Sequence, residues 1–548
     1  MVDLIITNAV IHTMNPDRSP VSAMAIARGE VIAIGGDLDV LELASEHTRV
    51  LDLNGAPVLP GLIDSHNHHR IAGEEELFRI GFSPAAGLEQ ICLAVEEWIK
   101  AHELSPGDWV LGGNWGSTLV PLFETTHPLA LLDAVSPQHP VVLSDDSHHN
   151  SWANSAALAA AGIDDSTPDP VGGRIVRDSL GHATGLLLES AGAQLEKARL
   201  AHEGIDVHRV ALSSERGIQL LHEFGITAFQ DASATRELLE ALAMLDDQGR
   251  LKSWVVTSLL INDTIFGNDF VGKDLIAVGS GYRTERHHPV FTKIFLDGVP
   301  PTRTAAFLEP YLPTHDRDPA HRGVTTMSID ELEGWLRHAA AADLGVKVHC
   351  TGDASVRMVL DVVERVRNDG ITTVVHVSHG QYVHRDDISR FAELDVIAEI
   401  SPFLWYPGVI PDALAQVIPQ ELGDRIHPNR ELLDAGATVV AGSDWPVSES
   451  PNPWHAIFGL VTRRDPTSQF PGALAPDQAI TVYEAIQAFT TSSARALRLG
   501  DTTGHLAPGM SADFVVLSAD PFDIEREQLK DIVTEQTWFR GEQVYHRP

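Results

Sequence analysis

The sequence predicts an α/β protein whose main body is a (β/α)8 TIM-like barrel. Three observations support this fold class. Short β-branched runs alternate with amphipathic stretches from about residue 225 onward, one further apolar strand lies near residue 60, and shorter strand patterns occupy both chain ends. Alternating strands and helices are typical of a parallel sheet covered by helices. Eight such units predict a closed barrel.

Eight segments have the composition of buried barrel strands. The first is "APVLPGLIDSH" (56–66), and the others occupy residues 225–232, 253–261, 289–298, 345–353, 372–380, 396–402 and 437–447. A helix signal lies between the fourth and fifth of the eight strands, where Ser328 and Glu331 have the spacing of a capping box before an amphipathic run. The order of strand and helix signals therefore fits repeated βα units.

Two departures from a plain barrel define the domain prediction. Residues 70–220 separate the first two strands and are far longer than an ordinary βα loop, so we expect an inserted subdomain there. Residues 1–55 and 500–548 both contain short alternating strands, which we expect to combine into one small β-sandwich-like domain. The barrel is then assigned to residues 56–499.

Composition limits the possible partners and location. The chain has 548 residues, with 76 acidic and 39 basic side chains and a formal net charge of −37. That charge repels nucleic acid and anionic membrane surfaces, so we expect neither as a partner. The N-terminal segment lacks the pattern of a secretory leader, and the two cysteines lie far apart. We therefore expect a cytoplasmic protein that acts on a small molecule.

Side chains that can bind metal follow the ends of the predicted strands. In a barrel these ends meet at one mouth, where the chemistry takes place. His66 and His68 are one residue apart, so both rings project to the same side of an extended strand and can bind one ion. The remaining side chains of this kind are Lys293, His349, His376, His379 and Asp444. An isolated pair of histidines is equally compatible with surface residues, and the surrounding ligands favour the metal site.

Lys293 is unusual because it lies within the apolar run "PVFTKIFLDG". A buried ammonium is costly unless it is paired or neutralised. Reaction with CO₂ would convert it into an anionic carbamate that can bridge two metal ions. A salt bridge to Asp297 or another carboxylate is the alternative.

Several motifs in order resemble one known family. They are "PGLIDSHNH", "TKIFLDG", "VHCTGD", "HGQYVHRDDISRFAELDV" and "AGSDWPV". Together they resemble the amidohydrolase superfamily, in particular its N-substituted formamide deformylase-like branch of metal-dependent hydrolases. The similarity extends over nearly the whole chain and includes "GGNWG" in the insertion and "GHLAPGMSADFVVLSADP" near the end.

The resemblance implies a metal centre with one or two divalent ions. Zinc is the first expectation, with manganese, cobalt or iron as alternatives because all accept nitrogen and oxygen ligands. The implied ligands are His66 and His68 for the first ion, Lys293 as the carboxylated bridge, His349 and His379 for the second ion, and Asp444 from the last strand. His379 is preferred to His376 because it stands in "HGQ", which is similar to the "HAQ" of the family. The resemblance also implies a homodimer.

The implied reaction is hydrolysis of a carbon–nitrogen bond in an amide, N-substituted formamide, carbamate or cyclic imide. A metal centre lowers the pKa of water toward about 7 and so generates hydroxide at neutral pH. Asp444 is the expected proton shuttle. Ester or lactone hydrolysis by the same centre is the main alternative, and a non-hydrolytic decarboxylase or isomerase is a further one.

Four side chains are predicted to contact substrate: Trp115, His148, His149 and Trp405. The first three lie in the predicted insertion, where Asn154 is compatible with either substrate contact or a helix cap. Trp405 belongs to the aromatic segment "SPFLWYPG", which would line an apolar pocket or pack in the core. His69 follows the HxH pair directly and is interpreted as a polar loop residue, with a supporting role at the site as the alternative. Cys350 is interpreted as a core residue.

Overall fold

An eight-stranded parallel sheet forms the centre of the molecule. The computed structural model describes residues 1–15, 20–83, 85–116, 119–123, 128–145, 150–170, 172–263, 268–313, 318–404 and 406–548. The sheet runs in the order β20-β19-β18-β17-β16-β15-β14-β7. Its strands are β7 (Leu62–Asn67), β14 (Ile226–Ala234), β15 (Trp254–Leu260), β16 (His287–Phe295), β17 (Gly345–Cys350), β18 (Val375–His379), β19 (Val396–Ile400) and β20 (Val439–Ala441). Each predicted barrel strand therefore has a counterpart in this sheet, although the first is confirmed only from Leu62 onward.

The two edge strands of this sheet meet and nearly close the barrel. The backbone amide of Asp444 donates to the carbonyl of His66 at 2.7 Å, and that of His68 donates to the carbonyl of Trp445 at 2.8 Å. A Cβ at Gly442 would lie 2.4 Å from the Cβ of His66, so only glycine permits this approach. Closure places the ends of the first and last strands side by side.

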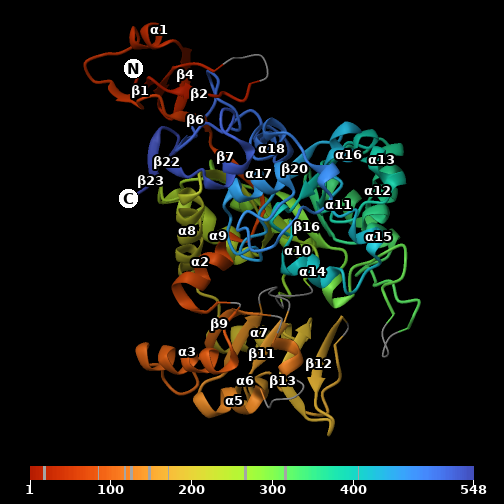
Figure 1. The fold of residues 1–548 in the computed structure, drawn as a ribbon. Coiled ribbons are helices and arrows are strands. Elements are labelled where there is room, and N and C mark those ends of the chain that lie inside the picture. Colours follow the sequence, from red (N-terminus) through yellow and green to blue (C-terminus); the bar gives the residue numbers. More distant parts are fainter. Residues whose placement is uncertain are drawn as a thin grey trace.

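Helices cover the outside of the barrel (Figure 1). Those around the strands are α8 (Val207–Glu223), α9 (Arg236–Asp247), α10 (Lys273–Gly279), α11 (Ile329–Ala341), α12 (Asp353–Asn368), α13 (Ile388–Glu393), α14 (Val409–Leu414), α15 (Gln420–Gly423), α16 (Asn429–Asp434), α17 (Pro453–Thr462), α18 (Val482–Ala488) and α19 (Thr491–Ala496). The predicted capping box opens α11, where the Ser328 hydroxyl accepts from the amide of Glu331. The largest apolar core lies between these helices and the strands, and it contains Cys350 as expected.

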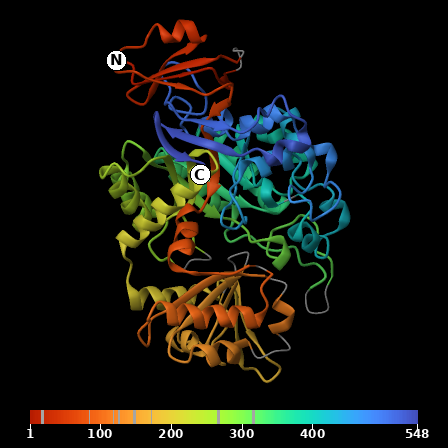
Figure 2. The ribbon, with the colours of Figure 1, turned by 60° about the vertical axis from the view of Figure 1, so that its left-hand side comes forward.

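Residues between β7 and β14 build a second sheet with its own apolar core. Helix α2 (His69–Phe78) leads into it, and the strand order is β12-β13-β11-β10-β9-β8. The strands are β8 (Ile80–Gly81), β9 (Val110–Trp115), β10 (Val141–Asp145), β11 (Asn150–Ala153), β12 (Gly173–Arg177) and β13 (Ala183–Glu189), with helices α3 (Leu88–Ala101), α4 (Val120–Phe123), α5 (Pro128–Val135), α6 (Ser155–Ala160) and α7 (Ala193–Glu203). Figures 1 and 2 show this orange part at one end of the barrel.

The chain ends form two small sheets at the opposite end of the barrel (Figures 1 and 2). One has the order β4-β3-β1-β5 and consists of β1 (Leu4–Thr7), β3 (Ala23–Ala27), β4 (Glu30–Gly35) and β5 (Arg49–Asp52), beside helix α1 (Asp37–Leu41). The other has the order β2-β6-β21-β22-β23 and consists of β2 (Val10–Ile11), β6 (Pro57–Pro60), β21 (Phe514–Leu517), β22 (Thr534–Phe539) and β23 (Glu542–His546). Strands from both ends of the chain thus share one sheet.

The segment 56–66, predicted as one strand, divides into two. Residues 57–60 form β6 in the terminal sheet, and the barrel strand β7 starts at Leu62. Gly61 separates them, and a Cβ there would lie 2.0 Å from the Thr227 hydroxyl. The close approach of the backbone to Thr227 thus requires glycine at the point where the chain passes from one sheet to the next.

Candidate metal centre

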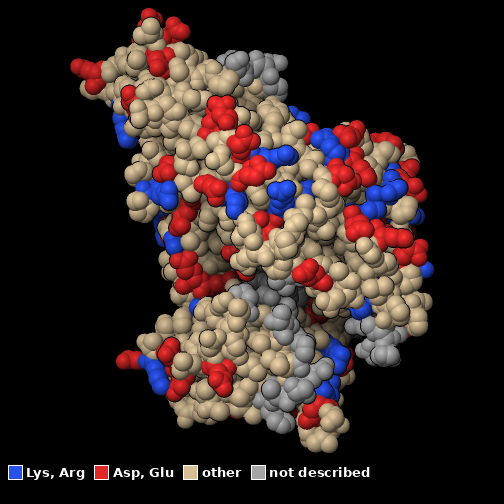
Figure 3. Space-filling model, in the orientation of Figure 1, with Lys and Arg blue, Asp and Glu red and all other residues tan. Residues whose placement is uncertain are grey.

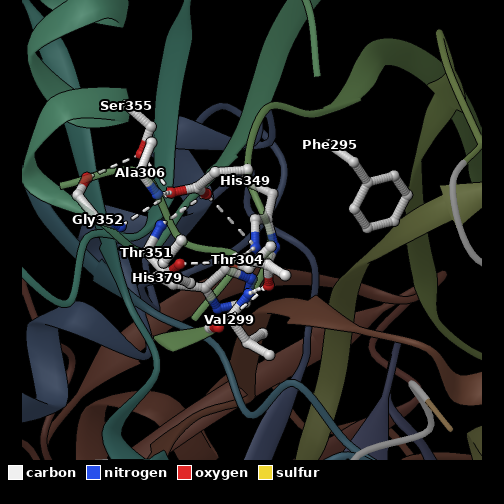
Figure 4. A network of polar contacts seen from close by, with 12 residues as sticks. Phe295, Val299, Thr304, Ala306, His349, Thr351, Gly352, Ser355 and His379 are labelled. Carbon is white, nitrogen blue, oxygen red and sulfur yellow. Dashed lines mark hydrogen bonds and ion pairs between the residues drawn. The ribbon is translucent and has the colours of Figure 1, made fainter. Parts of the chain in front are cut away.

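Four predicted histidines gather at the mouth of the barrel, where strands β7, β17 and β18 end. The ring centroids of His68 and His66 are 5.6 Å apart, those of His66 and His379 are 4.7 Å apart, and those of His379 and His349 are 4.7 Å apart. Figure 4 shows the last two rings next to one another. Imidazoles that are far apart in the chain therefore lie within reach of a shared ion cluster.

Asp444 completes the group from the loop after β20. Its Oδ1 lies 3.4 Å from Nε2 of His66 and 3.4 Å from Nε2 of His68. These three side chains are buried, and their ligand atoms all lie within 4.8 Å of one another. Two imidazole nitrogens and a carboxylate oxygen at this spacing fit a divalent cation of the first transition row.

The outer ring nitrogens of the histidines are held by neighbouring groups. Nδ1 of His66 is 2.5 Å from Oε1 of Glu399, and Nδ1 of His68 is 2.9 Å from the Ser233 hydroxyl. Nδ1 of His379 is 2.9 Å from the Ser401 hydroxyl. Nε2 of His349 is 3.1 Å from the Gly298 carbonyl, which can only accept, so the proton of the neutral ring is on Nε2. Such outer contacts orient imidazole ligands toward a metal.

The electrostatic environment holds His66, His379 and Asp444 in the protonation states that coordinate a metal ion. Burial lowers the pKa of His66 to about 3, with a further contribution from the nearby ammonium groups. Burial also places the pKa of His379 well below its usual value. Burial raises the pKa of Asp444, but attraction to the histidines outweighs burial and leaves it below its ordinary range. Neutral imidazoles and an ionised carboxylate are the forms that coordinate metal.

Lys293 lies in β16 with its ammonium inside the barrel, 3.4 Å from Nε2 of His66. Burial, together with the positive charge of Lys347, lowers its pKa to about 7. The alternative of a salt bridge to Asp297 is not supported, because Lys293 forms no ion pair within the described ranges. Asp297 instead accepts hydrogen bonds from the amides of Ala306, Thr351 and Gly352 and from the Ser355 hydroxyl (Figure 4).

Two neighbouring histidines are excluded as ligands by their contacts. In His376, Nδ1 is 2.8 Å from Glu399 and Nε2 is 3.2 Å from the Ala496 carbonyl. In His69, Nδ1 is 2.9 Å from Asp231 and Nε2 is 2.6 Å from the Ser214 hydroxyl. The interpretation of His69 as a polar loop residue is wrong, since it is the first residue of α2 and is fully buried. Both rings use their two nitrogens within the protein interior.

The predicted substrate residues are only partly described. His148, His149 and Trp405 lie outside the described residues. Trp115 is fully buried in the core of the second sheet, where its indole donates to the Leu143 carbonyl at 2.8 Å. These contacts favour a packing role for Trp115. Asn154 caps α6 by accepting from the amide of Ala157 at 3.0 Å, which resolves the choice between cap and substrate contact in favour of the cap.

Sequence reasoning missed two charged residues behind the site, Lys347 and Glu399. Nζ of Lys347 is 2.6 Å from Oε2 of Glu399, and both side chains are fully buried. Burial raises the pKa of Glu399, but attraction to Lys347 and His66 holds it well below its usual value. A charged residue inside an apolar strand, the signal that indicated Lys293, also marks "GVKVHC" and "VIAEISP".

A cavity of about 360 Å³ opens beside His68, between α2, α8 and the second sheet. Apolar residues from the sheet, Leu111 and Val142, form part of its lining. Charged side chains on the wall contact one another, as in the pairs of Glu74 with Arg70 and with Arg79. Figure 3 shows a hollow with acidic groups along it between the barrel and the second sheet. One candidate ligand, His68, thus borders a space that both parts of the chain line.

Comparison with known proteins decides the family. The model of the amidohydrolase family matches residues 49–545. The chain belongs to the amidohydrolase family. This confirms the resemblance inferred from the motifs and makes the chain a hydrolase that acts on carbon–nitrogen bonds.

Relatives of this amidohydrolase extend over its full length. It is 29% identical to the protein LONG AFTER FAR-RED 3 of Arabidopsis thaliana, over 100% of this chain and 92% of that protein. It is 28% identical to the N-substituted formamide deformylase of Arthrobacter pascens, over 100% of this chain and 99% of the relative. An uncharacterized metal-dependent hydrolase from Pyrococcus horikoshii shares the fold, with a TM-score of 0.76 at 23% identity over 95% of this chain and 99% of that structure.

No helix in the described part of this amidohydrolase has both the length and the apolar character needed to cross a membrane.

Proposed function

We propose that this amidohydrolase hydrolyses a carbon–nitrogen bond in a small acyl substrate, namely an amide, N-substituted formamide, carbamate or cyclic imide. The observation that carries this proposal is the position of Asp444, whose carboxylate lies 3.4 Å from Nε2 of both His66 and His68. The formamide deformylase relative supports this bond type. The fold supports this proposal, because all four histidines lie at the ends of parallel strands, where barrel enzymes have their active sites.

The ligand set is proposed to hold one or two divalent cations, with zinc as the first expectation. His66, His68 and Asp444 would hold the first, and His349 and His379 the second. A bound cation supplies Lewis acidity, which polarises the acyl oxygen and lowers the pKa of water. Lys293 would contribute a bridging ligand as its carbamate. Its pKa of about 7 leaves part of the amine uncharged at neutral pH, which is the form that reacts with CO₂.

Asp444 is the proposed proton shuttle. Its ionised carboxylate can accept a proton from the attacking water and deliver it to the departing nitrogen, which must be protonated before it leaves. The loop after β20 fixes this carboxylate through the bond between its own backbone amide and the His66 carbonyl. No hydroxyl or thiol nucleophile is required for this reaction.

The substrate is proposed to bind in the cavity beside His68. Its volume of about 360 Å³ suits a small molecule. Arg70 and Arg79 contact Glu74, and Arg199 contacts Glu196, but acidic side chains outnumber basic ones in the lining of the cavity. An uncharged substrate with an apolar group therefore fits better than an anionic one.

Elemental analysis combined with an acyl-substrate panel tests this function. We expect bound divalent metal and turnover of amide-type substrates that a chelator abolishes. Turnover of esters or lactones alone would replace the proposal with the ester hydrolase alternative. Bound metal without hydrolysis of any acyl substrate would favour a decarboxylase or isomerase.

A further inference from the structure

The outer nitrogen of His66 lies within hydrogen-bond distance of a carboxylate. Its Nδ1 lies 2.5 Å from Oε1 of Glu399, whereas His68 and His379 face the hydroxyls of Ser233 and Ser401. A hydroxyl can donate or accept, so it is compatible with either tautomer of an imidazole. An ionised carboxylate only accepts, so it requires the proton on Nδ1.

The opposite side of the His66 ring faces the cation site. Nε2 lies 3.4 Å from Oδ1 of Asp444 and 3.4 Å from Nζ of Lys293. With the proton on Nδ1, the lone pair is on Nε2 and points into this group. The tautomer set by Glu399 is therefore the tautomer that metal binding requires.

The second oxygen of Glu399 is held in place from two further strands. Oε2 accepts from Nζ of Lys347 at 2.6 Å and from Nδ1 of His376 at 2.8 Å. Lys347 also donates to the carbonyl of Ser65, the residue before His66, at 2.6 Å. Strands β7, β17, β18 and β19 are thus joined through one fully buried carboxylate.

Lys347 and Lys293 have different roles because only Lys347 is paired with Glu399. The two lysines occupy partner positions on the adjacent strands β16 and β17. Glu399 pairs with Lys347, so the carboxylate is neutralised and its bond to His66 adds no net charge to the interior. Lys293 contacts His66 on its metal-facing side instead. The adjacent lysines therefore have separate roles.

We propose that Glu399 is a positioning residue that fixes the Nδ1–H tautomer of His66 and aims its Nε2 at the cation, with Lys347 as its counter-ion. This inference rests on the proposed function, since it concerns the affinity of the same centre. Removal of a group that hydrogen-bonds a metal-binding histidine typically weakens metal binding by about 10–100-fold.

Glu399→Gln tests the tautomer directly. Glutamine keeps the shape but has a single acceptor oxygen, so it cannot accept from His66 on one atom and from Lys347 and His376 on the other. We expect the dissociation constant of Zn²⁺, measured on metal-stripped protein by competition with a chromogenic chelator, to rise by about 10–100-fold. Ser401→Ala is the matched control, because it removes a neutral partner from His379. An equal loss of affinity in both variants would overturn the special role of the carboxylate.

A double variant separates positioning from simple stabilisation. Glu399→Gln alone leaves the Lys347 ammonium buried without its partner, so it also lowers the unfolding temperature. Adding Lys347→Met removes that charge, and we expect stability to recover while the Zn²⁺ affinity stays low. Recovery of affinity together with stability would show that Glu399 acts only as half of a structural ion pair.

The Zn²⁺ titration of wild type distinguishes a failure of the proposed function from a failure of the proposed role of Glu399. Failure of metal-stripped wild type to bind Zn²⁺ would contradict the proposed function. Tight binding by wild type and equally tight binding by Glu399→Gln would contradict this inference alone.

Discussion

Replacement of Asp444 by asparagine isolates the proton shuttle from the metal ligands. Asp444 has a φ of 58°, in the left-handed region that asparagine tolerates better than most residues. Its backbone amide, which bonds the His66 carbonyl at 2.7 Å, is unchanged by the substitution. Asparagine also keeps the volume and one oxygen that can face Nε2 of His66 and His68. The fold and most of the metal should therefore be retained.

The expected loss of activity follows from the lost proton transfer. A positioned general acid or base typically contributes about 10²–10⁴-fold to the rate. At about 1.4 kcal/mol for each factor of ten, this corresponds to about 3–5 kcal/mol of transition-state stabilisation. We expect kcat to fall by this factor, while the cation content stays close to that of wild type.

The assay combines turnover on the best substrate of the acyl panel with elemental analysis and thermal unfolding of the same preparations. Asp444→Ala provides the comparison, since it removes the ligand oxygen as well as the shuttle and is expected to lose metal. Activity of Asp444→Asn within tenfold of wild type at full metal content would refute the assignment of Asp444 as the proton shuttle.

Further predictions concern other parts of the molecule. Lys293→Ala should lower the metal content, with partial recovery in added short carboxylic acids, and wild-type metal content in this variant would contradict the carbamate bridge. Trp115→Ala should lower the free energy of unfolding by about 3–5 kcal/mol through loss of core packing, whereas unchanged stability with a raised KM would show that the indole binds substrate. Burial lowers the pKa of His222 from 6.5 to about 4, so its neutral form stabilises the fold above pH 6.5 and this contribution is lost as the pH falls toward 4. The free energy of unfolding should fall by about 3 kcal/mol over this range, at 1.36 kcal/mol per pH unit. Urea unfolding of His222→Gln should show a smaller loss of stability between pH 6.5 and pH 4 than that of wild type. An identical pH dependence in variant and wild type would contradict the burial of a neutral imidazole.

The barrel could be predicted from sequence because its strands are buried on both sides. Such strands are continuous apolar runs, and most were found within a few residues of their observed bounds, although the last ends at Ala441 and was predicted to continue to residue 447. The first strand was a further exception, because "APVLPGLIDSH" is apolar throughout although it enters two different sheets. The chain passes from β6 to β7 at Gly61, where its backbone lies close to Thr227. That contact joins residues far apart in the chain, so the sequence does not show where one strand ends and the next begins.

The candidate ligands could be selected from sequence because their residue types are rare at the ends of apolar strands. The roles of neighbouring histidines could not, since His69 and His376 have the same composition signal as the ligands. Their hydrogen bonds to Asp231 and Glu399 exclude them, and these partners belong to other strands.

By itself, the sequence determined the barrel, the family and a set of candidate metal ligands, because buried strands and coordinating residues are recorded locally as apolar runs and residue types. Tertiary structure alone decided which imidazole nitrogen faces the cation site and which carboxylate balances each buried lysine. Those properties depend on contacts across the barrel, such as the one between His66 and Glu399, and no local pattern specifies the distance between two strands that are remote in the chain.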